Sequence, residues 1–312
     1  MRNKFLSPAP RISIVTPSLN QAKFLEDTIR SVLDQDYPNV EYMIIDGGSA
    51  DGSVEIIRKY ETRLAYWTSE PDRGQADAVN KGWRRATGDI LAYINSDDTY
   101  IPGALRLAAE AFARDAEVGL VYGRCNVVDE NGAVLRERPV RAASFADVLR
   151  WSPSIPQPSL FVRRSVGELL NADLHYTMDY ELTLRVGLKH KMQFIPHLLA
   201  NMRDHPAAKT ALDPLGHVEE GIAVAEKFFT QPLPADIAAL KNVTLATLGI
   251  RKARVLARLG RGAEAREFIA NALELCPDVR NQAAAAWVMS LLGANAIASL
   301  RRLKRAWLRR SS

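Results

Sequence analysis

The stretch Ile90–Asp98, with the sequence ILAYINSDD, constrains the fold of this 312-residue chain more than any other stretch. Its first five residues include four apolar ones, and their aromatic and β-branched members are typical of a strand buried on both faces. The run ends in Asn95, Ser96, Asp97 and Asp98, so two carboxylates follow the carboxyl end of a central strand. Open α/β sheets bind their ligands at that edge.

Two adjacent carboxylates beside a closed core repel each other, and burying them is costly unless a cation or a donor-rich ligand neutralises them. Oxygen ligands of this kind suit Mg²⁺ or Mn²⁺, with phosphate oxygens completing the coordination shell. An isolated pair of aspartates is also common in a solvated turn after a strand. The sequence upstream therefore decides between a metal site and a turn.

Three shorter apolar runs precede this stretch, and each is followed by a segment with helical spacing. The expected strands are Ile12–Thr16, Glu41–Asp46 and Leu64–Thr68, and the expected helices are Phe24–Gln35, Val54–Tyr60 and Ala76–Ala86. Alternating strands and helices with short connections predict an α/β fold with a doubly wound, mostly parallel sheet. The chain has no GxxxxGK[ST] motif and no GxGxxG after its first strand, which disfavours Walker-type and dinucleotide-binding sites.

The second part of the chain changes character. Val118–Tyr122 and Asn126–Val128 predict strands, and the turn after them predicts a hairpin. A helix opened by Thr177 and Asp179 precedes a further strand, and from about Gly216 the pattern is entirely helical. We therefore expect a domain over residues 1–215 and a helical C-terminal extension over residues 216–312.

Composition and charge exclude several classes of protein. A quarter of the residues are charged and 47% are apolar, as in globular domains, and no run of eighteen apolar residues predicts a membrane span. Cys125 and Cys276 are far apart and have no spacing typical of a zinc site or a disulfide framework, as expected of a protein in a reducing cytoplasm. The polar N-terminal residues argue against a signal peptide. Residues 251–312 carry a net charge of +9, which leaves −4 for residues 1–250 and argues against nucleic acid as a partner.

Residues 11–210 resemble the family-2 glycosyltransferases of the GT-A fold, a Rossmann-like fold, and in particular their bacterial polysaccharide-biosynthesis branch. The matching pieces occur in order and at compatible spacing: TPSLN, Ser31–Gln35, Ile45–Asp51, Asp72–Gly82, Ala86–Asp98, Gln157–Val162 and Met178–Leu182. The resemblance implies transfer of a sugar, usually with inversion, from a nucleotide-diphosphate donor to a glycan or lipid-linked acceptor. It also implies a divalent cation, Mn²⁺ or Mg²⁺, as cofactor.

The resemblance also implies which residues bind the donor. Asp46 matches the carboxylate that accepts a hydrogen bond from the nucleobase, in a pocket lined by Thr16, Pro17 and Asn20. An Asx-turn or a helix cap before Gly47 is the structural alternative for Asp46. The segment that closes over the nucleotide and donor sugar is matched by Gly74, Asp77, Asn80 and Lys81. Backbone N–H groups at a helix start can bind a diphosphate there, although Lys81 also fits a solvated surface lysine.

The matching residues further imply a metal site and a catalytic base. Asp98 matches a direct metal ligand, and Asp97 matches a ligand that also faces the ribose. His205 matches a position that contacts the metal or the diphosphate, with Arg203 and Lys209 in the same polar loop. The carboxylate that takes the proton from the acceptor hydroxyl is matched by Asp179, with a helix N-cap as the competing interpretation and Glu181 as the alternative base.

The C-terminal extension lies outside this resemblance. Arg254–Cys276 resembles one helix pair of a tetratricopeptide-type repeat, which we expect to act as a helical cap because one pair cannot bury its own faces. Ala283–Leu308 combines an apolar stripe with two tryptophans, and six basic residues lie between Arg301 and Arg310, which is the composition of an interfacial membrane helix. A surface helix packed on the same chain is the alternative. The sequence thus favours a cytoplasmic enzyme at the inner face of the cell membrane.

Two other functions fit parts of the pattern. A non-catalytic nucleotide-sugar sensor or scaffold at the membrane would keep Asp46, Asp97 and Asp98, while Asp179 would serve only as a helix cap. A sugar nucleotidyltransferase would share the sheet and the metal. That enzyme would need a glycine-rich, lysine-containing segment near the first strand, and TPSLNQAKF is not such a segment.

Overall fold

The computed structural model describes residues 9–152 and 155–292. These residues divide into two compact units. The first holds the described residues up to Val148 together with those from Ser152 to Ala208, and the second holds Leu149–Trp151 and the described residues from Lys209 onward. The expected domain boundary at residue 215 falls inside a helix, α8 (Pro214–Phe228).

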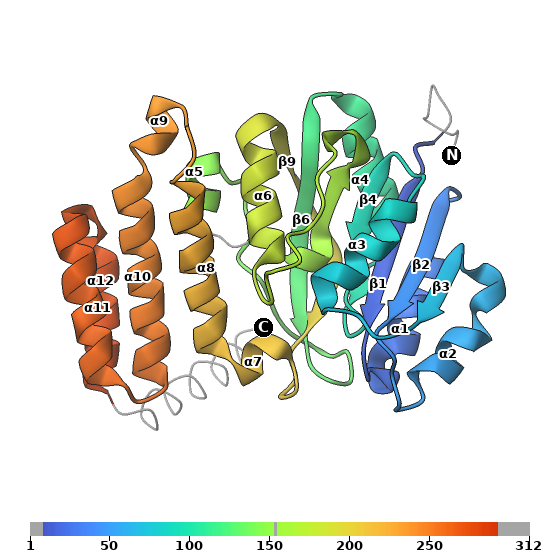
Figure 1. Ribbon diagram of the computed structural model, residues 1–312, viewed down its shortest axis with the longest axis horizontal. Helices are drawn as coiled ribbons and strands as arrows, with labels where there is room; N and C mark the ends of the chain where they lie inside the picture. Colours follow the sequence, from blue (N-terminus) through green and yellow to red (C-terminus); the bar gives the residue numbers. More distant parts are fainter. Residues whose placement is uncertain (1–8, 153–154, 293–312) are drawn as a thin grey trace. The chain divides into compact units, whose positions relative to one another are not determined.

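A mixed sheet with the strand order β3-β2-β1-β4-β8-β6-β9-β5 forms the centre of the first unit, and β7 pairs with β6 (Figure 1). The strands are β1 (Ile12–Ser18), β2 (Val40–Asp46), β3 (Tyr66–Ser69), β4 (Ile90–Tyr93), β5 (Thr99–Tyr100), β6 (Val118–Val128), β7 (Val134–Glu137), β8 (Leu160–Arg163) and β9 (Lys191–Arg203).

The sheet is mixed, and its N-terminal half is parallel as predicted. Strands β3, β2, β1 and β4 are parallel neighbours, as are β6 and β9. Strand β8, however, lies antiparallel between β4 and β6, and β7 and β5 also pair in antiparallel fashion. The regular alternation of strand and helix that predicts parallel pairing ends at residue 98. The expected hairpin is present, and the two runs at its start form one continuous strand, β6.

Helices cover both faces of this sheet, which explains why the central strands β1 and β4 are buried at every position. One face packs against α1 (Ala22–Leu33), α2 (Ser53–Lys59) and α4 (Ala104–Arg114), through residues such as Ile14 and Ile44. The other face packs against α3 (Gln75–Arg85) and α6 (Met178–Lys189), through residues such as Val15 and Met43. The remaining short helices of this unit are η1 (Glu61–Arg63), η2 (Gln157–Ser159), η3 (Arg164–Val166) and most of α5 (Phe145–Leu149).

The second unit is helical throughout its described residues. It contains α8 with α7 (Lys209–Leu212), α9 (Ala235–Ala238), α10 (Lys241–Arg258), α11 (Gly262–Leu275), η4 (Pro277–Val279) and α12 (Arg280–Leu291). The expected helix pair is confirmed as α10 and α11, which share an apolar core and turn at Gly260 with a positive φ of 80°. That this unit caps the catalytic domain stays a prediction.

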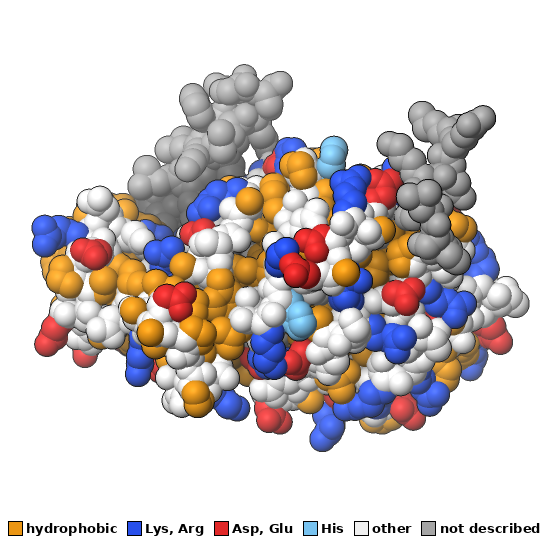
Figure 2. All heavy atoms as spheres, turned by 90° about the horizontal axis from the view of Figure 1, so that it is seen from above, with side chains coloured by type: hydrophobic (Ala, Val, Ile, Leu, Met, Phe, Trp, Pro, Cys, Tyr) orange, Lys and Arg blue, Asp and Glu red, His pale blue; other side chains and the backbone are white. Residues whose placement is uncertain are grey.

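The expected membrane helix begins in α12, where Trp287, Val288 and Leu291 are 43%, 59% and 64% exposed. Residues 293–308 of that expected helix lie outside the described residues. Among the helices that the structure describes, none is both long and apolar enough to cross a bilayer. On the face shown in Figure 2, basic and acidic side chains are interspersed.

Candidate active site

The acidic pair occupies the turn between β4 and β5. Asp98 is 4% exposed, and its Oδ1 accepts a hydrogen bond of 2.9 Å from the backbone N–H of Arg203. Its backbone carbonyl accepts a 2.7 Å bond from the hydroxyl of Thr28 on α1. Burial, followed by the neighbouring carboxylate of Asp97, raises the pKa of Asp98 well above its ordinary value. A positive charge placed near this turn would therefore stabilise the ionised form of Asp98.

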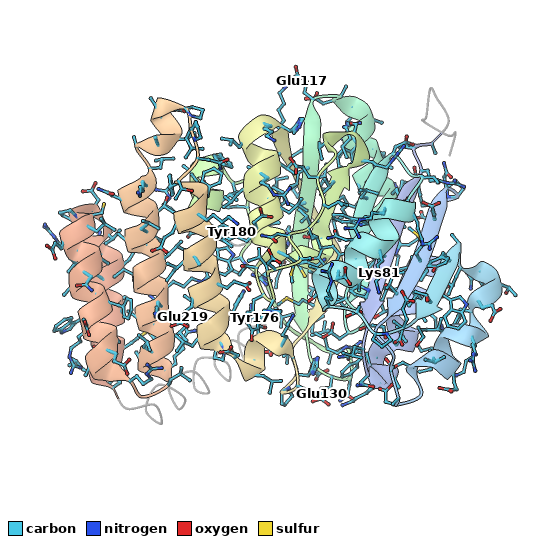
Figure 3. All side chains as sticks on the ribbon, in the orientation of Figure 1. Lys81, Glu117, Glu130, Tyr176, Tyr180 and Glu219 are labelled. Carbon is cyan, nitrogen blue, oxygen red and sulfur yellow. The ribbon has the colours of Figure 1, made fainter. Side chains whose placement is uncertain are left out.

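Arg203, at the end of β9, fixes the backbone around this pair. Its guanidinium lies 4.7 Å from the ring of Phe24 and is almost completely buried. Nε donates to the carbonyl of Asp97 at 2.9 Å, and Nη1 donates to the carbonyl of Glu130 at 2.7 Å. Arg203 thus ties the acidic turn to the turn of the β6–β7 hairpin, where Figure 3 labels Glu130.

His205 joins the same cluster from the loop after β9. Its Nε2 lies 3.0 Å from Oδ2 of Asp97, and its ring packs at a tilt on Phe24, with 4.9 Å between the centroids. The residue is 5% exposed. The structure therefore brings together the three residues that sequence analysis assigned to the metal, namely Asp97, Asp98 and His205.

Within the described ranges, no group of three or more His, Cys, Asp and Glu side chains is arranged so that it could hold a metal ion by itself. Mg²⁺ and related ions at nucleotide sites, however, commonly take one or two carboxylates and complete their shell with substrate phosphates and water. The two carboxylates are donors that suit Mn²⁺ or Mg²⁺. The residues present therefore fit an ion that is completed by a diphosphate.

Asp179 lies in the first turn of α6, after Thr177 at the N-cap position. The N-cap interpretation therefore falls on Thr177, although its side chain makes no capping bond. Burial first, and then the carboxylates of Asp179 and Asp98, raise the pKa of Tyr93 at the end of β4. Both carboxylates therefore act electrostatically on one buried hydroxyl, and the role of Asp179 as the base stays a prediction.

Glu181, the alternative base, is held in an ion pair on α6. Its two carboxylate oxygens accept bonds of 2.7 and 2.8 Å from Arg185, which also pairs with Glu168. This bidentate contact within one helix gives Glu181 a structural role.

Asp46 ends β2, and its carboxylate shapes the turn that follows. It accepts bonds from the N–H groups of Gly48 and Ser49 and from the hydroxyls of Ser49 and Ser69, over 2.6–3.1 Å. The residue is 0% exposed. This is the Asx-turn that sequence analysis kept as the alternative role for Asp46.

The other residues of the expected nucleobase pocket support the same loop. Thr16 is buried in β1 and shares a 2.9 Å hydrogen bond with the hydroxyl of Tyr42, and Pro17 is buried next to it. Asn20 has a positive φ of 52°, and its Oδ1 accepts a 3.0 Å bond from the N–H of Ala50. The loops after β1 and β2 are therefore tied to each other at the carboxyl edge of the sheet.

Three expected donor-binding residues on α3 have structural partners. Gly74 is the N-cap, with a φ of 108° that favours glycine. Burial raises the pKa of Asp77, but hydrogen bonds from Arg73 outweigh burial, so that this pKa lies below its ordinary value. Asn80 is 2% exposed and exchanges two hydrogen bonds with the backbone of Leu170.

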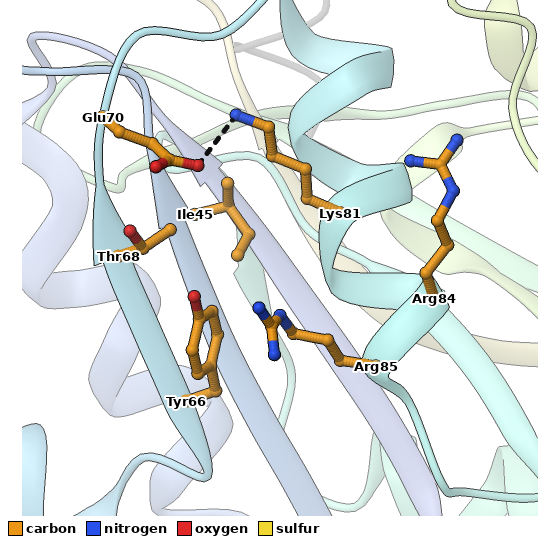
Figure 4. A pocket seen from close by; sticks show the side chains of 7 residues that line it. All are labelled: Ile45, Tyr66, Thr68, Glu70, Lys81, Arg84 and Arg85. Atoms are coloured by element: carbon orange, nitrogen blue, oxygen red, sulfur yellow. Dashed lines mark hydrogen bonds and ion pairs between the residues drawn. The ribbon is translucent and has the colours of Figure 1, made fainter.

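Lys81 lies on the outer side of α3 and lines a cavity of about 300 Å³ over β2 and β3 (Figure 4). Its Nζ lies 3.2 Å from Oε1 of Glu70, and farther along the helix the guanidinium of Arg85 lies 4.2 Å from the ring centroid of Tyr66. Figure 3 shows Lys81 in its place on the helix. Lys81 is thus a paired, partly exposed cation beside the strand ends.

Lys209 begins α7 in the second unit, and burial lowers its pKa. Its role in donor binding stays a prediction.

Two polar residues at this edge were not named by sequence analysis. Asp72 accepts a 2.7 Å bond from the N–H of Gly74 through Oδ1, and Gln75 donates a 2.6 Å bond to Oδ1 of Asn95. Both lie within the matching piece Asp72–Gly82. Their position in that piece was the signal by which sequence analysis could have found them. Only the fold shows that Gln75 reaches the acidic turn and that Asp72 reaches the end of β2.

The fold and the site define an α/β protein with an acidic turn at the carboxyl edge of its sheet, and comparisons with known proteins identify its family. The model of glycosyl transferase family 2 matches residues 13–166. An uncharacterized glycosyltransferase of Mycobacterium tuberculosis is 33% identical over 188 residues, which cover 59% of this chain and 71% of that protein. The chain belongs to glycosyltransferase family 2. A Bacillus subtilis glycosyltransferase named for teichuronic acid biosynthesis, TuaG, is 40% identical over 94 residues, 29% of this chain and 37% of TuaG.

Solved structures share the fold. S. aureus TarS 1–349 in complex with UDP-GlcNAc has a TM-score of 0.63 at 16% identity, over 90% of this chain and 89% of that one. The mannosyltransferase PcManGT of Pyrobaculum calidifontis, in complex with GDP-Man and Mn²⁺, has a TM-score of 0.57 at 20% identity, over 90% and 86% of the two chains. The expected GT-A fold is thereby confirmed.

Proposed function

We propose that this glycosyltransferase moves a sugar, with inversion and with the help of a divalent cation, from a nucleotide-diphosphate sugar to a glycan or lipid-linked acceptor in cell-surface polysaccharide synthesis. The observation that carries the proposal is the acidic pair after β4, in which Asp98 is buried and the carboxylate of Asp97 lies 3.0 Å from Nε2 of His205. The complexes of TarS with UDP-GlcNAc and of PcManGT with GDP-Man support the class of donor. The name of TuaG supports the class of product.

The donor binds along the carboxyl edge of β1, β2 and β4. Asp97, Asp98 and His205 hold the cation, and Arg203 keeps the turn that carries the aspartates in place through its bonds to Asp97 and Asp98. When bound, the cation offsets the negative charge that grows on the departing diphosphate. The partly exposed ammonium of Lys81 adds positive charge beside that group.

Asp179 is the base. Its carboxylate takes the proton from an acceptor hydroxyl while the hydroxyl oxygen attacks the anomeric carbon of the donor sugar. The bond from that carbon to the diphosphate oxygen breaks on the opposite face, so the configuration at the anomeric carbon inverts. We assign this role to Asp179 and not to Glu181, because both carboxylate oxygens of Glu181 accept hydrogen bonds from Arg185.

The enzyme works in the cytoplasm at the inner face of the cell membrane, as a peripheral protein. Residues 293–312 contain six basic residues and no acidic one, and they follow the exposed apolar side chains of α12. Basic residues near an anionic surface contribute about 1 kcal/mol each to binding. This attachment would place the active site near lipid-linked acceptors.

A donor screen tests the proposal. The purified chain is incubated with a panel of UDP-, GDP-, dTDP-, ADP- and CDP-sugars and Mn²⁺, with a membrane extract as the source of acceptor. We expect release of the nucleotide diphosphate from one donor class and a product whose anomeric configuration, measured by NMR, is opposite to that of the donor. Binding of a donor without any turnover across the panel would favour the sensor instead.

A further inference from the structure

A groove lies between α3 and β3, the strand at the edge of the sheet, and it contains the cavity of about 300 Å³ drawn in Figure 4. The face of β3 that carries Tyr66 and Thr68 lines one side of the cavity. Lys81, Arg84 and Arg85 of α3 line the other side. We call this feature the β3–α3 groove. Its lining has three basic residues and one acidic residue, so it carries a net charge of +2.

The periods of a strand and of a helix bring these side chains together. Residues 66, 68 and 70 alternate along β3 and the position after it, so they share one face of the sheet. Residues 81, 84 and 85 are three and four positions apart on α3, so they form one stripe. Lys81 and Arg85 have the spacing at which like charges on a helix repel each other. An anion bound in the groove would offset that repulsion.

The three basic side chains differ in what already balances their charge. The ammonium of Lys81 lies 3.2 Å from Oε1 of Glu70 and 4.0 Å from Oδ2 of Asp77. Neither Arg84 nor Arg85 forms an ion pair with another residue of the described ranges, and both are exposed. The excess positive charge of the groove therefore belongs to the two arginines.

Tyr66 fixes the orientation of one of these arginines. The guanidinium carbon of Arg85 lies 4.2 Å from the ring centroid of Tyr66, and Figure 4 shows the Arg85 side chain extending toward that ring. A guanidinium that stacks on a ring keeps its N–H donors in its own plane, where two of them can bind two oxygens of one phosphate. The hydroxyl of Thr68, on the same face of β3, is a further donor.

We infer that the β3–α3 groove binds a phosphate monoester, with Arg84 and Arg85 as its main contacts. A phosphate monoester carries a charge of about −1.5 to −2 near pH 7, which matches the net charge of the groove. The acidic turn after β4 needs a cation before it accepts such a group, whereas the groove supplies its own positive charge. The inference therefore goes beyond the proposed function. A soluble phosphate ester and the phosphate head group of a lipid share this chemistry.

Calorimetric titration of the full chain with glycerol 3-phosphate at low salt tests the groove, with EDTA present to keep divalent cations from the acidic turn. We expect Arg84→Gln/Arg85→Gln to bind about 10- to 100-fold more weakly than wild type. Arg84→Lys/Arg85→Lys keeps the charge but loses the planar fork, so it should recover only part of the affinity. Arg58→Gln/Lys59→Gln removes an exposed basic pair of equal charge from α2 and should bind like wild type.

Sedimentation with vesicles separates the two sources of the phosphate. Phosphatidic acid presents a monoester at the surface, whereas phosphatidylglycerol presents a diester. If a lipid is the ligand, wild type should bind phosphatidic acid more strongly than phosphatidylglycerol, and Arg84→Gln/Arg85→Gln should lose this difference. Binding of glycerol 3-phosphate without such a difference would assign a soluble ligand.

Thermal melting of each variant confirms that it folds. The inference would be wrong if wild type bound neither glycerol 3-phosphate nor phosphatidic acid selectively, or if folded Arg84→Gln/Arg85→Gln bound both as wild type does. A loss of equal size in Arg58→Gln/Lys59→Gln would also overturn it, because the attraction would then belong to the overall charge. Each of these results would leave the metal-dependent donor site of the proposed function standing.

Discussion

At the scale of single residues, the two carboxylates in the first turn of α6, Asp179 and Glu181, have different surroundings. Asp179 acts on the same buried tyrosine as Asp98, whereas Glu181 is bound at both oxygens by Arg185. The ion pair of Glu181 opposes transfer of a proton from an acceptor hydroxyl to that carboxylate. The two residues are therefore expected to respond differently to the same kind of substitution.

Asp179→Asn is expected to lower kcat by about 10²- to 10⁴-fold, which is the usual contribution of a general base, with little change in nucleotide affinity. Steady-state kinetics measures the change in kcat, and calorimetry measures the nucleotide affinity. Glu181→Gln is the matched variant, since it changes a carboxylate two positions away. A large loss of kcat in Glu181→Gln, with Asp179→Asn fully active, would exchange the two roles.

At the scale of elements, part of the fold could be predicted from the sequence and part could not. The apolar runs before residue 98 predict β1, β2 and β4 with small errors at their ends, because a strand buried on both faces has few alternatives. The antiparallel insertion of β8 could not be predicted, since Leu160–Arg163 is four residues long and its pairing depends on distant strands.

The candidate site shows the same limit. The order of motifs predicted that Asp97, Asp98 and His205 lie together, but it gave no sign that Asp46, Asn80 and Glu181 are hydrogen-bonded to neighbouring residues. Two of these neighbours, Ser69 and Leu170, are distant in sequence from the residues that they bind. Only the folded chain brings them close.

The packing of α3 against β1 gives a test at this scale. A Cβ at Gly82 would lie 2.4 Å from Cγ2 of Val15, so Gly82→Ala should cost about 1–3 kcal/mol of stability through overpacking. Gly249, inside α10, has ordinary contact distances of 3.7 Å or more for a Cβ. Gly249→Ala should therefore gain about 0.5–1 kcal/mol from helix propensity. Scanning calorimetry compares the melting temperature of each variant with that of wild type. If Gly82→Ala melted at the wild-type temperature or above it, the close contact between α3 and β1 would be contradicted.

Glu41 on β2 predicts a dependence of stability on pH. Burial raises its pKa, but hydrogen bonds from Ser13 and Thr87 outweigh burial and hold this pKa below the ordinary value of 4.5. Because the folded chain then binds the proton more weakly than the unfolded chain, the stabilisation is complete above about pH 4.5. It is lost as the pH falls through the lower pKa of the folded state.

Melting temperatures measured between pH 3 and pH 6 check this expectation. Glu41→Gln should melt lower than wild type at pH 6, and the difference should shrink as the pH falls. Glu61→Gln controls for general acid effects. A difference between Glu41→Gln and wild type that stays constant over the whole range would show that Glu41 contributes no pH-dependent stability.

At the scale of the whole molecule, the uneven charge is the main feature. The first 250 residues carry −4 and the last 62 carry +9, so attraction to an anionic surface belongs to the C-terminal end. Removal of residues 293–312 leaves every described helix intact. We expect wild-type chain to sediment with vesicles of phosphatidylglycerol at low salt and the shortened chain to remain in the supernatant. Equal sedimentation of both chains would show that residues 293–312 are not the membrane contact.

The central claim is that the acidic pair holds a nucleotide diphosphate through a divalent cation. Its most direct test is calorimetric titration of the preferred nucleotide diphosphate with Mn²⁺ and with EDTA, for wild-type protein and for Asp98→Asn. The account predicts that wild-type protein binds only when Mn²⁺ is present and that folded Asp98→Asn loses this metal-dependent binding. Equal nucleotide affinity with EDTA and with Mn²⁺, or unchanged metal-dependent binding in Asp98→Asn, would contradict it.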